Sequence, residues 1–242
     1  MKPTLLLLLG AMALFSIAAL GQTTITVSDV SPTGSPLTFK GTVTWKPRFS
    51  ADCNITGHNN SSKNIVAWTA STNGIKPNGE IYQTPAMHDH FWKDDAMISM
   101  MAPAGQDFDT GFFCPAFNTG TRNAPDGGSG PASLTITATF VQFTDGTWWG
   151  DPAQAKEIAW QRNDALTYLK QLSAMSASAL AALIAKEPAY GIERGGPNHL
   201  RGEMVLTWKY LSEDSTPAAL AADIAARLQL AKTHSAWLAA LP

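Results

Sequence analysis

Charged side chains are scarce in this chain of 242 residues, and the two signs nearly cancel. Lysine and arginine total 17 against 19 aspartates and glutamates, which gives a formal net charge of −2. Proteins that bind nucleic acid or an anionic membrane surface need a basic face. We therefore expect neither as a partner, whereas the 45% of hydrophobic residues is enough to bury a core.

Long hydrophobic runs are also missing, apart from one at the amino terminus. There Lys2 precedes an apolar run over residues 5–17, and Ala19, Leu20 and Gly21 follow as a cleavage site. This pattern predicts a secretory signal peptide over residues 1–21, too short for a confident membrane span. We expect a secreted or periplasmic mature protein with no membrane insertion after cleavage.

Cysteine occurs only twice, as Cys53 and Cys114. In an oxidising compartment two such cysteines are expected to form a disulfide, which stabilises the fold by roughly 2–4 kcal/mol. Neither lies in a Cys-x-x-Cys pair, so a redox motif is not indicated.

Several catalytic motifs are absent as well. The chain has no Gly-x-Ser-x-Gly elbow and no ordered set of serine, histidine and aspartate. Its glycine-rich stretches do not lie between a strand and a helix, as a phosphate-binding loop would require. We expect no nucleotide or other organic cofactor.

The clearest structural pattern lies in residues 134–140, where Leu134, Ile136, Ala138 and Phe140 alternate with threonines. This period of two predicts a strand with one buried face. Past Phe140 the alternation slips, which predicts a bulge or a change of face. A turn at Asp145 and Gly146 follows, and Asp151 and Pro152 then predict a helix start.

Residues 22–151 have the pattern of an all-β unit. Strands are predicted near residues 25–30, 37–45, 64–72, 96–101 and 106–113, with a polar loop at 51–63 and a poorly patterned stretch before residue 96. Cys53, Trp68 and Cys114 have the order and approximate spacing that resembles the immunoglobulin-like superfamily, although Phe112 stands where that family has tyrosine. The resemblance implies an antiparallel immunoglobulin-like β-sandwich, and no particular function.

Residues 152–242 have the 3.6-residue periodicity of helices, as in the stripe of Ile158, Ala165, Leu169 and Leu172. A last helix is predicted from Thr216 and Pro217. Residues 204–211 fit a helix or a strand. The whole chain is therefore expected to have an α+β fold, with a mostly helical carboxyl-terminal region packed on the sandwich.

Histidine and methionine cluster between residues 87 and 101. Imidazole with thioether is a ligand set for copper, so His88, His90, Met97 and Met101 are candidate metal ligands. With His58 or Asp89 as a third ligand, the same place could hold a zinc or iron ion for hydrolysis. The competing interpretation is that the methionines are strand packing and the histidines bond backbone carbonyls.

The function expected from these features is a secreted, non-catalytic binding or interaction module for a protein, glycan or cell-surface partner. The first alternative is an extracytoplasmic carrier of copper or another metal that uses the cluster of histidine and methionine. The second is a metal-dependent hydrolase at the same place.

Overall fold

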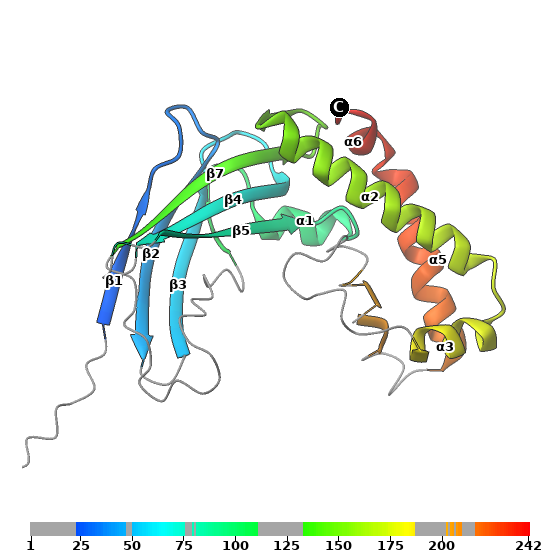
Figure 1. The fold of residues 1–242 in the computed structure, drawn as a ribbon. Coiled ribbons are helices and arrows are strands. Elements are labelled where there is room, and N and C mark those ends of the chain that lie inside the picture. Colours follow the sequence, from blue (N-terminus) through cyan, green and yellow to red (C-terminus); the bar gives the residue numbers. More distant parts are fainter. Residues whose placement is uncertain are drawn as a thin grey trace, which may run out of the picture.

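The computed structural model describes residues 23–46, 50–75, 79, 81–110, 133–186, 202, 204–205, 207–209 and 216–242. Its strands are β1 (Thr23–Asp29), β2 (Leu37–Lys46), β3 (Ser50–Asn59), β4 (Ile65–Ile75), β5 (Ile81–Asp89), β6 (Asp107–Asp109), β7 (Ser133–Phe143) and β8 (Trp148–Gly150). Its helices are α1 (Asp95–Met101), α2 (Pro152–Ser173), α3 (Ala177–Lys186), α5 (Pro217–Thr233) and α6 (Ser235–Ala239). The chain thus has an α+β fold, as its sequence predicts (Figure 1).

The expected signal peptide, residues 1–21, lies outside the described residues, so its removal stays a prediction. Among the helices that the structure describes, none has the length and apolar character needed to cross a membrane.

The strand predicted from residue 134 is β7, which pairs with β4, β1 and β8. Its residues alternate between half-buried and buried as far as Phe140, and residues 140–143 are all buried. Phe140 faces Thr69 whereas Ala138 faces Ala70, so Thr139 is an extra residue in the pairing with β4. The bulge predicted near Phe140 is therefore confirmed.

A single sheet contains all the strands described, in the order β5-β4-β7-β1-β2-β3-β6, with β8 beside β7. Strand β1 connects its two halves. Residues 23–26 pair with β2 in the antiparallel sense, and residues 27–29 pair with β7 in the parallel sense.

This sheet curls until strands that are far apart in its order come into contact. The ring centroid of Trp68 on β4 lies 5.6 Å from that of Phe39 on β2 and 6.3 Å from that of Phe108 on β6. In a flat sheet, three strand spacings of about 4.8 Å would keep β4 and β2 roughly 14 Å apart. The expected immunoglobulin-like sandwich of two stacked antiparallel sheets is not confirmed, because one mixed sheet curls around the core instead.

Residues 51–63, predicted to be a polar loop, contain most of strand β3, so that prediction is wrong. The alternation in β3 is weak because glycine and asparagine, at Gly57 and Asn59, share its buried positions with Ile55. A Cβ atom at Gly57 would lie 2.4 Å from the ring of Phe108 on β6, so the close approach of this ring requires glycine.

Residues 96–101, predicted to be a strand, lie in helix α1 instead. Asp94 caps this helix, since its Oδ1 accepts a hydrogen bond from the Met97 N–H at 2.8 Å. Methionine occurs in both strands and helices, whereas the hydrogen bond to the Asp94 side chain stabilises the start of a helix.

Strand β5, in the poorly patterned stretch, lies at one edge of the described sheet. The His90 N–H donates to the Val66 carbonyl oxygen of β4 at 2.9 Å. The backbone N–H and carbonyl groups of even-numbered residues in this strand therefore point toward β4. Those of odd-numbered residues, including Pro85, point away from β4, to the open edge of the sheet. Proline has no N–H to offer a further strand, which protects the edge from pairing with another chain.

The helix starts predicted from sequence are confirmed. Asp151 accepts a hydrogen bond from the Ala153 N–H at 2.8 Å, with Pro152 in the first turn of α2. Thr216 caps α5 in the same way, with Pro217 as its first residue. The described residues between 204 and 209 are helical, which excludes a strand there.

Two main apolar clusters hold the molecule together. The first lies inside the curl of the sheet and includes Trp68 and Phe39. The second joins Val66 of β4 and Phe91 to buried residues of the helices, such as Leu169. The helices lie beyond the ends of β4, β5 and β7, so this second cluster attaches them to that end of the sheet (Figure 1).

Candidate functional site

A buried ion pair lies where the sheet meets the helices. Arg162 of α2 donates from Nε to Asp89 Oδ2 at 2.8 Å and from Nη2 to Asp89 Oδ1 at 2.9 Å, and both side chains are fully buried. The guanidinium also lies over the Phe91 ring, 4.6 Å from its centroid. This bidentate geometry locks α2 to the end of β5.

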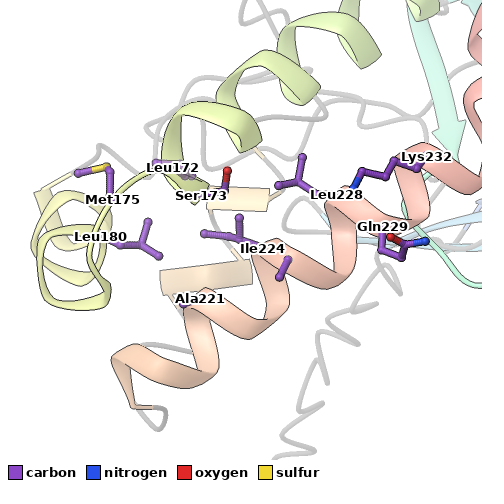
Figure 2. A pocket seen from close by; sticks show the side chains of 10 residues that line it. Leu172, Ser173, Met175, Leu180, Ala221, Ile224, Leu228, Gln229 and Lys232 are labelled. Atoms are coloured by element: carbon purple, nitrogen blue, oxygen red, sulfur yellow. The ribbon is translucent and has the colours of Figure 1, made fainter.

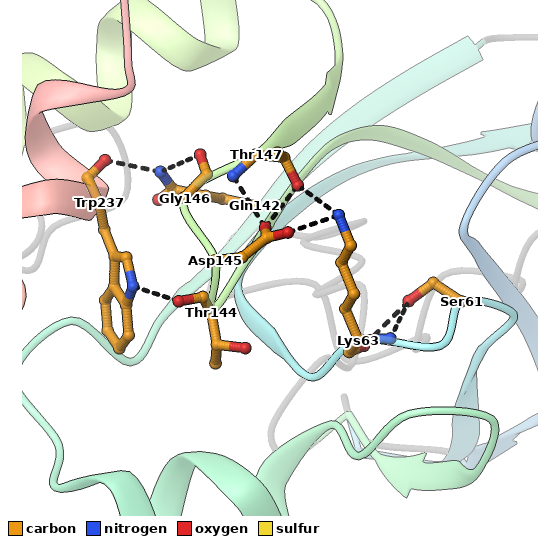
Figure 3. A network of polar contacts seen from close by, with 8 residues as sticks. All are labelled: Ser61, Lys63, Gln142, Thr144, Asp145, Gly146, Thr147 and Trp237. Atoms are coloured by element: carbon orange, nitrogen blue, oxygen red, sulfur yellow. Dashed lines mark hydrogen bonds and ion pairs between the residues drawn. The ribbon is translucent and has the colours of Figure 1, made fainter.

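Gln142 of β7 continues the network toward the carboxyl terminus. Its Oε1 accepts a hydrogen bond from Arg162 Nη1 at 2.7 Å, and its Nε2 donates to the Trp237 carbonyl oxygen at 2.7 Å. The indole Nε1 of Trp237 in turn donates to the Thr144 carbonyl oxygen at 2.5 Å. Figure 3 shows these bonds fastening α6 to the turn between β7 and β8.

An exposed ion pair braces the same turn. The Nζ of Lys63 lies 2.6 Å from Asp145 Oδ2, and Thr147 donates to Asp145 Oδ1 from both its backbone nitrogen and its hydroxyl (Figure 3). The hydrogen bond from Lys63, followed by that from the Thr147 hydroxyl, lowers the pKa of Asp145 from 3.8 to about 2.

His234 connects the carboxyl-terminal helices to Phe91 and to Asp95, the first residue of α1. Its buried ring places Nδ1 2.7 Å from the Phe91 carbonyl oxygen and Nε2 3.2 Å from Asp95 Oδ1. Trp237 stacks on this ring, with the two ring centroids 3.9 Å apart.

The predicted metal ligands have different surroundings. His88 of β5 stacks on Trp68, with ring centroids 4.4 Å apart, so it faces the interior of the curl. Asp89 is its neighbour in the strand and faces the helices, where it holds Arg162. His90 is buried, whereas Met97 and Met101 lie on α1 and are exposed and half-buried.

Within the described ranges, no three or more histidine, cysteine, aspartate and glutamate residues form a group that could hold a metal ion. His58, the other possible third ligand, lies on the exposed surface of β3. Its Nδ1 is 2.7 Å from Asp107 Oδ1, and Lys40 Nζ is 2.5 Å from Asp107 Oδ2. The hydrogen bonds from Lys40 and then His58 lower the pKa of Asp107.

Cys53 is half-buried in β3 and, among the described residues, is not a free thiol. Its expected partner, Cys114, lies outside the described residues. The pairing of Cys53 with Cys114 therefore stays a prediction.

A cavity of about 250 Å³ lies between α2, α3 and α5. Most of the residues that line it are apolar, among them Leu172, Met175, Leu180, Ala221, Ile224 and Leu228, and Ser173, Gln229 and Lys232 are the polar ones. Gln229 and Lys232 lie at one end, whereas Met175 and Leu180 lie at the other (Figure 2). One end of the cavity is therefore polar with a positive charge, and the other end is apolar, with the hydroxyl-bearing Ser173 between them.

Sequence reasoning missed the network around Arg162, but a signal for it existed. Arg162 falls on the apolar stripe of α2, four residues after Ile158 and three before Ala165. A charged residue within such a stripe needs a buried partner. The identity of that partner, Asp89, cannot be read from the spacing because it lies 73 residues away in the chain.

Comparison with protein-family models, with curated proteins and with solved structures finds no match for this chain.

Proposed function

We propose that this protein is an exported, non-catalytic binding protein whose ligand is a small molecule with an apolar body and an anionic head group. The observation that carries the proposal is the cavity between α2, α3 and α5. The signal-peptide pattern of residues 1–21 supports export.

The two ends of the cavity differ in the way that such a ligand requires. Leu180 and Ile224 are buried side chains on its apolar walls and would contact the body of the ligand. Lys232 is an exposed cation at the opposite end from Leu180 and would contact the head group (Figure 2). Because Lys232 remains in contact with water, the charge interaction adds selectivity more than affinity.

The size of the cavity limits the ligand. Its volume of about 250 Å³ is below the roughly 300–1,000 Å³ of ligand pockets in general, so the ligand must be small. A straight-chain compound of about ten non-hydrogen atoms, such as octanoate, is a suitable probe of this size.

The test is calorimetric titration of the protein with octanoate and with octanol. We expect octanoate to bind about fivefold more tightly, because an exposed charge pair contributes up to about 1 kcal/mol. Lys232→Gln should remove this difference and leave octanol binding unchanged. Lys156→Gln, on the exposed face of α2 and outside the cavity lining, is the matched control and should change neither affinity.

Filling the cavity tests the location of the site. Ile224→Trp places a larger side chain in the cavity and should abolish binding of both compounds, with the folded state checked by circular dichroism. The proposal fails if the unchanged protein binds neither compound, or if Ile224→Trp binds both as before.

The metal-dependent hydrolase gains no support from the geometry, and we do not propose it. Asp89 is held by two hydrogen bonds from Arg162, and His58 is paired with Asp107. Neither side chain is placed beside His88 and His90 as a further ligand in the described part of the chain.

A further inference from the structure

Helix α1 carries three methionines, and none of them belongs to the core. Ile98 is its one buried residue, whereas Met97 is 40% exposed, Met100 is 72% exposed and Met101 is half-buried. Large apolar side chains are costly to leave in water. The exposure of these methionines therefore calls for an explanation other than packing.

Helical geometry places the three thioethers on one continuous surface. Successive residues of an α-helix turn by about 100°, so Met97 lies about 60° from Met100 and about 40° from Met101 around the axis. Counted from Ile98, the angles are about 60° for Met101, about 100° for Met97 and about 160° for Met100. The exposures rise in the same order, so the observed burial agrees with this arrangement. Residues three and four apart on a helix are neighbours, so Met97 adjoins both Met100 and Met101, which lie about 100° apart on either side of it.

We propose that Met97, Met100 and Met101 form a binding site for Cu(I). Thioether sulfur is a soft ligand that selects Cu(I) over the harder divalent ions. The local charge also suits a cation, because the last turn of the helix has no basic residue, and Asp94 and Asp95 outnumber Lys93 at its start. This site differs from the one expected from sequence, since it uses Met100 and neither His88 nor His90.

The first test is a titration of the protein with Cu(I), kept reduced by ascorbate, in competition with the chelator bicinchoninate. We expect one Cu(I) ion per chain and an X-ray absorption spectrum with sulfur as the only protein ligand. Thioethers do not titrate, so the affinity should stay constant between about pH 7.5 and 5.0, whereas an imidazole site would weaken as the rings are protonated. Absence of Cu(I) binding, or nitrogen in the ligand shell, would overturn the proposal.

The second test replaces all three methionines of α1 by leucine. Leucine has a similar volume and helix propensity, so the variant should keep the fold, as measured by circular dichroism. We expect a loss of Cu(I) affinity of at least about a hundredfold, because three ligands are removed. Met175→Leu changes a methionine of the cavity lining that is 37% exposed and should bind Cu(I) as before.

Cu(I) binding by the triple variant with unchanged affinity would disprove the site even if the unchanged protein binds the ion. This inference is independent of octanoate binding. Ile224→Trp should abolish binding of octanoate and leave Cu(I) binding intact, so the two proposals can fail separately.

Discussion

Breaking the buried ion pair between Arg162 and Asp89 by removing one partner should destabilise the protein strongly. Arg162→Met keeps the length of the side chain but removes two hydrogen bonds to Asp89 and one to Gln142. It leaves the Asp89 carboxylate buried, with the hydrogen bond from the Phe91 N–H at 2.9 Å. Because an uncompensated buried charge results, the free energy of unfolding should fall by about 3–5 kcal/mol.

The measurement is urea unfolding followed by circular dichroism, with thermal unfolding alongside. For a chain of this size, each kcal/mol shifts Tm by about 2–4 °C, so Arg162→Met should lower Tm by roughly 6–20 °C. The matched control is Arg227→Met. Arg227 also places its Nε 2.7 Å from a carboxylate, that of Asp223, but its side chain is 17% exposed and that of Asp223 is 31% exposed. The control should cost clearly less than Arg162→Met, because water reaches both side chains and Asp223 keeps the hydrogen bond from Trp208 Nε1.

A double change separates the pair from the rest of the network. If Arg162→Met and Asp89→Leu are combined, no buried charge remains, and the double variant should be more stable than Arg162→Met alone. The reasoning is refuted if Arg162→Met and Arg227→Met destabilise equally, or if the double variant is the least stable of the set.

Three further predictions concern the sheet and its edge. Gly57→Ala should lower the free energy of unfolding by about 1–3 kcal/mol in urea, because the new Cβ meets the Phe108 ring at 2.4 Å, and Phe108→Leu should recover part of the loss. Pro85→Thr restores an N–H at the edge of β5 and should increase self-association in sedimentation velocity; an unchanged monomer fraction would argue against a protected edge. Asp145 has a lowered pKa, so its ion pair stabilises the protein above about pH 4 and loses that effect as the pH falls toward about 2. Lys63→Met should remove this part of the acid dependence, measured by unfolding at pH 5 and pH 2, and the change should stay below about 1 kcal/mol because the pair is exposed.

Elements with strong local signals could be predicted from the sequence. β7 combines alternating apolar residues with threonine, and α2 begins with an aspartate cap followed by proline. Such patterns are decided by backbone geometry within a few residues, so they do not depend on the rest of the fold.

The predictions for β3 and α1 were wrong because their sequence patterns are weak. The β3 strand contains glycine at a position where Phe108 needs the room, and its polar outward face resembles a loop. Helix α1 was expected to be a strand because methionines suit both structures, and only the cap at Asp94 distinguishes them.

Periodicity, caps and composition are local or additive properties, so the described helices after residue 151, strand β7 and the near-neutral charge could be predicted from the residues alone. The tertiary structure decided everything that depends on contacts between distant residues. Curling of one sheet brings Trp68 to Phe39, and the packing of α2 against the end of β5 pairs Asp89 with Arg162. Residue spacing contains no information on these contacts, because they form only when strands and helices far apart in the chain come together.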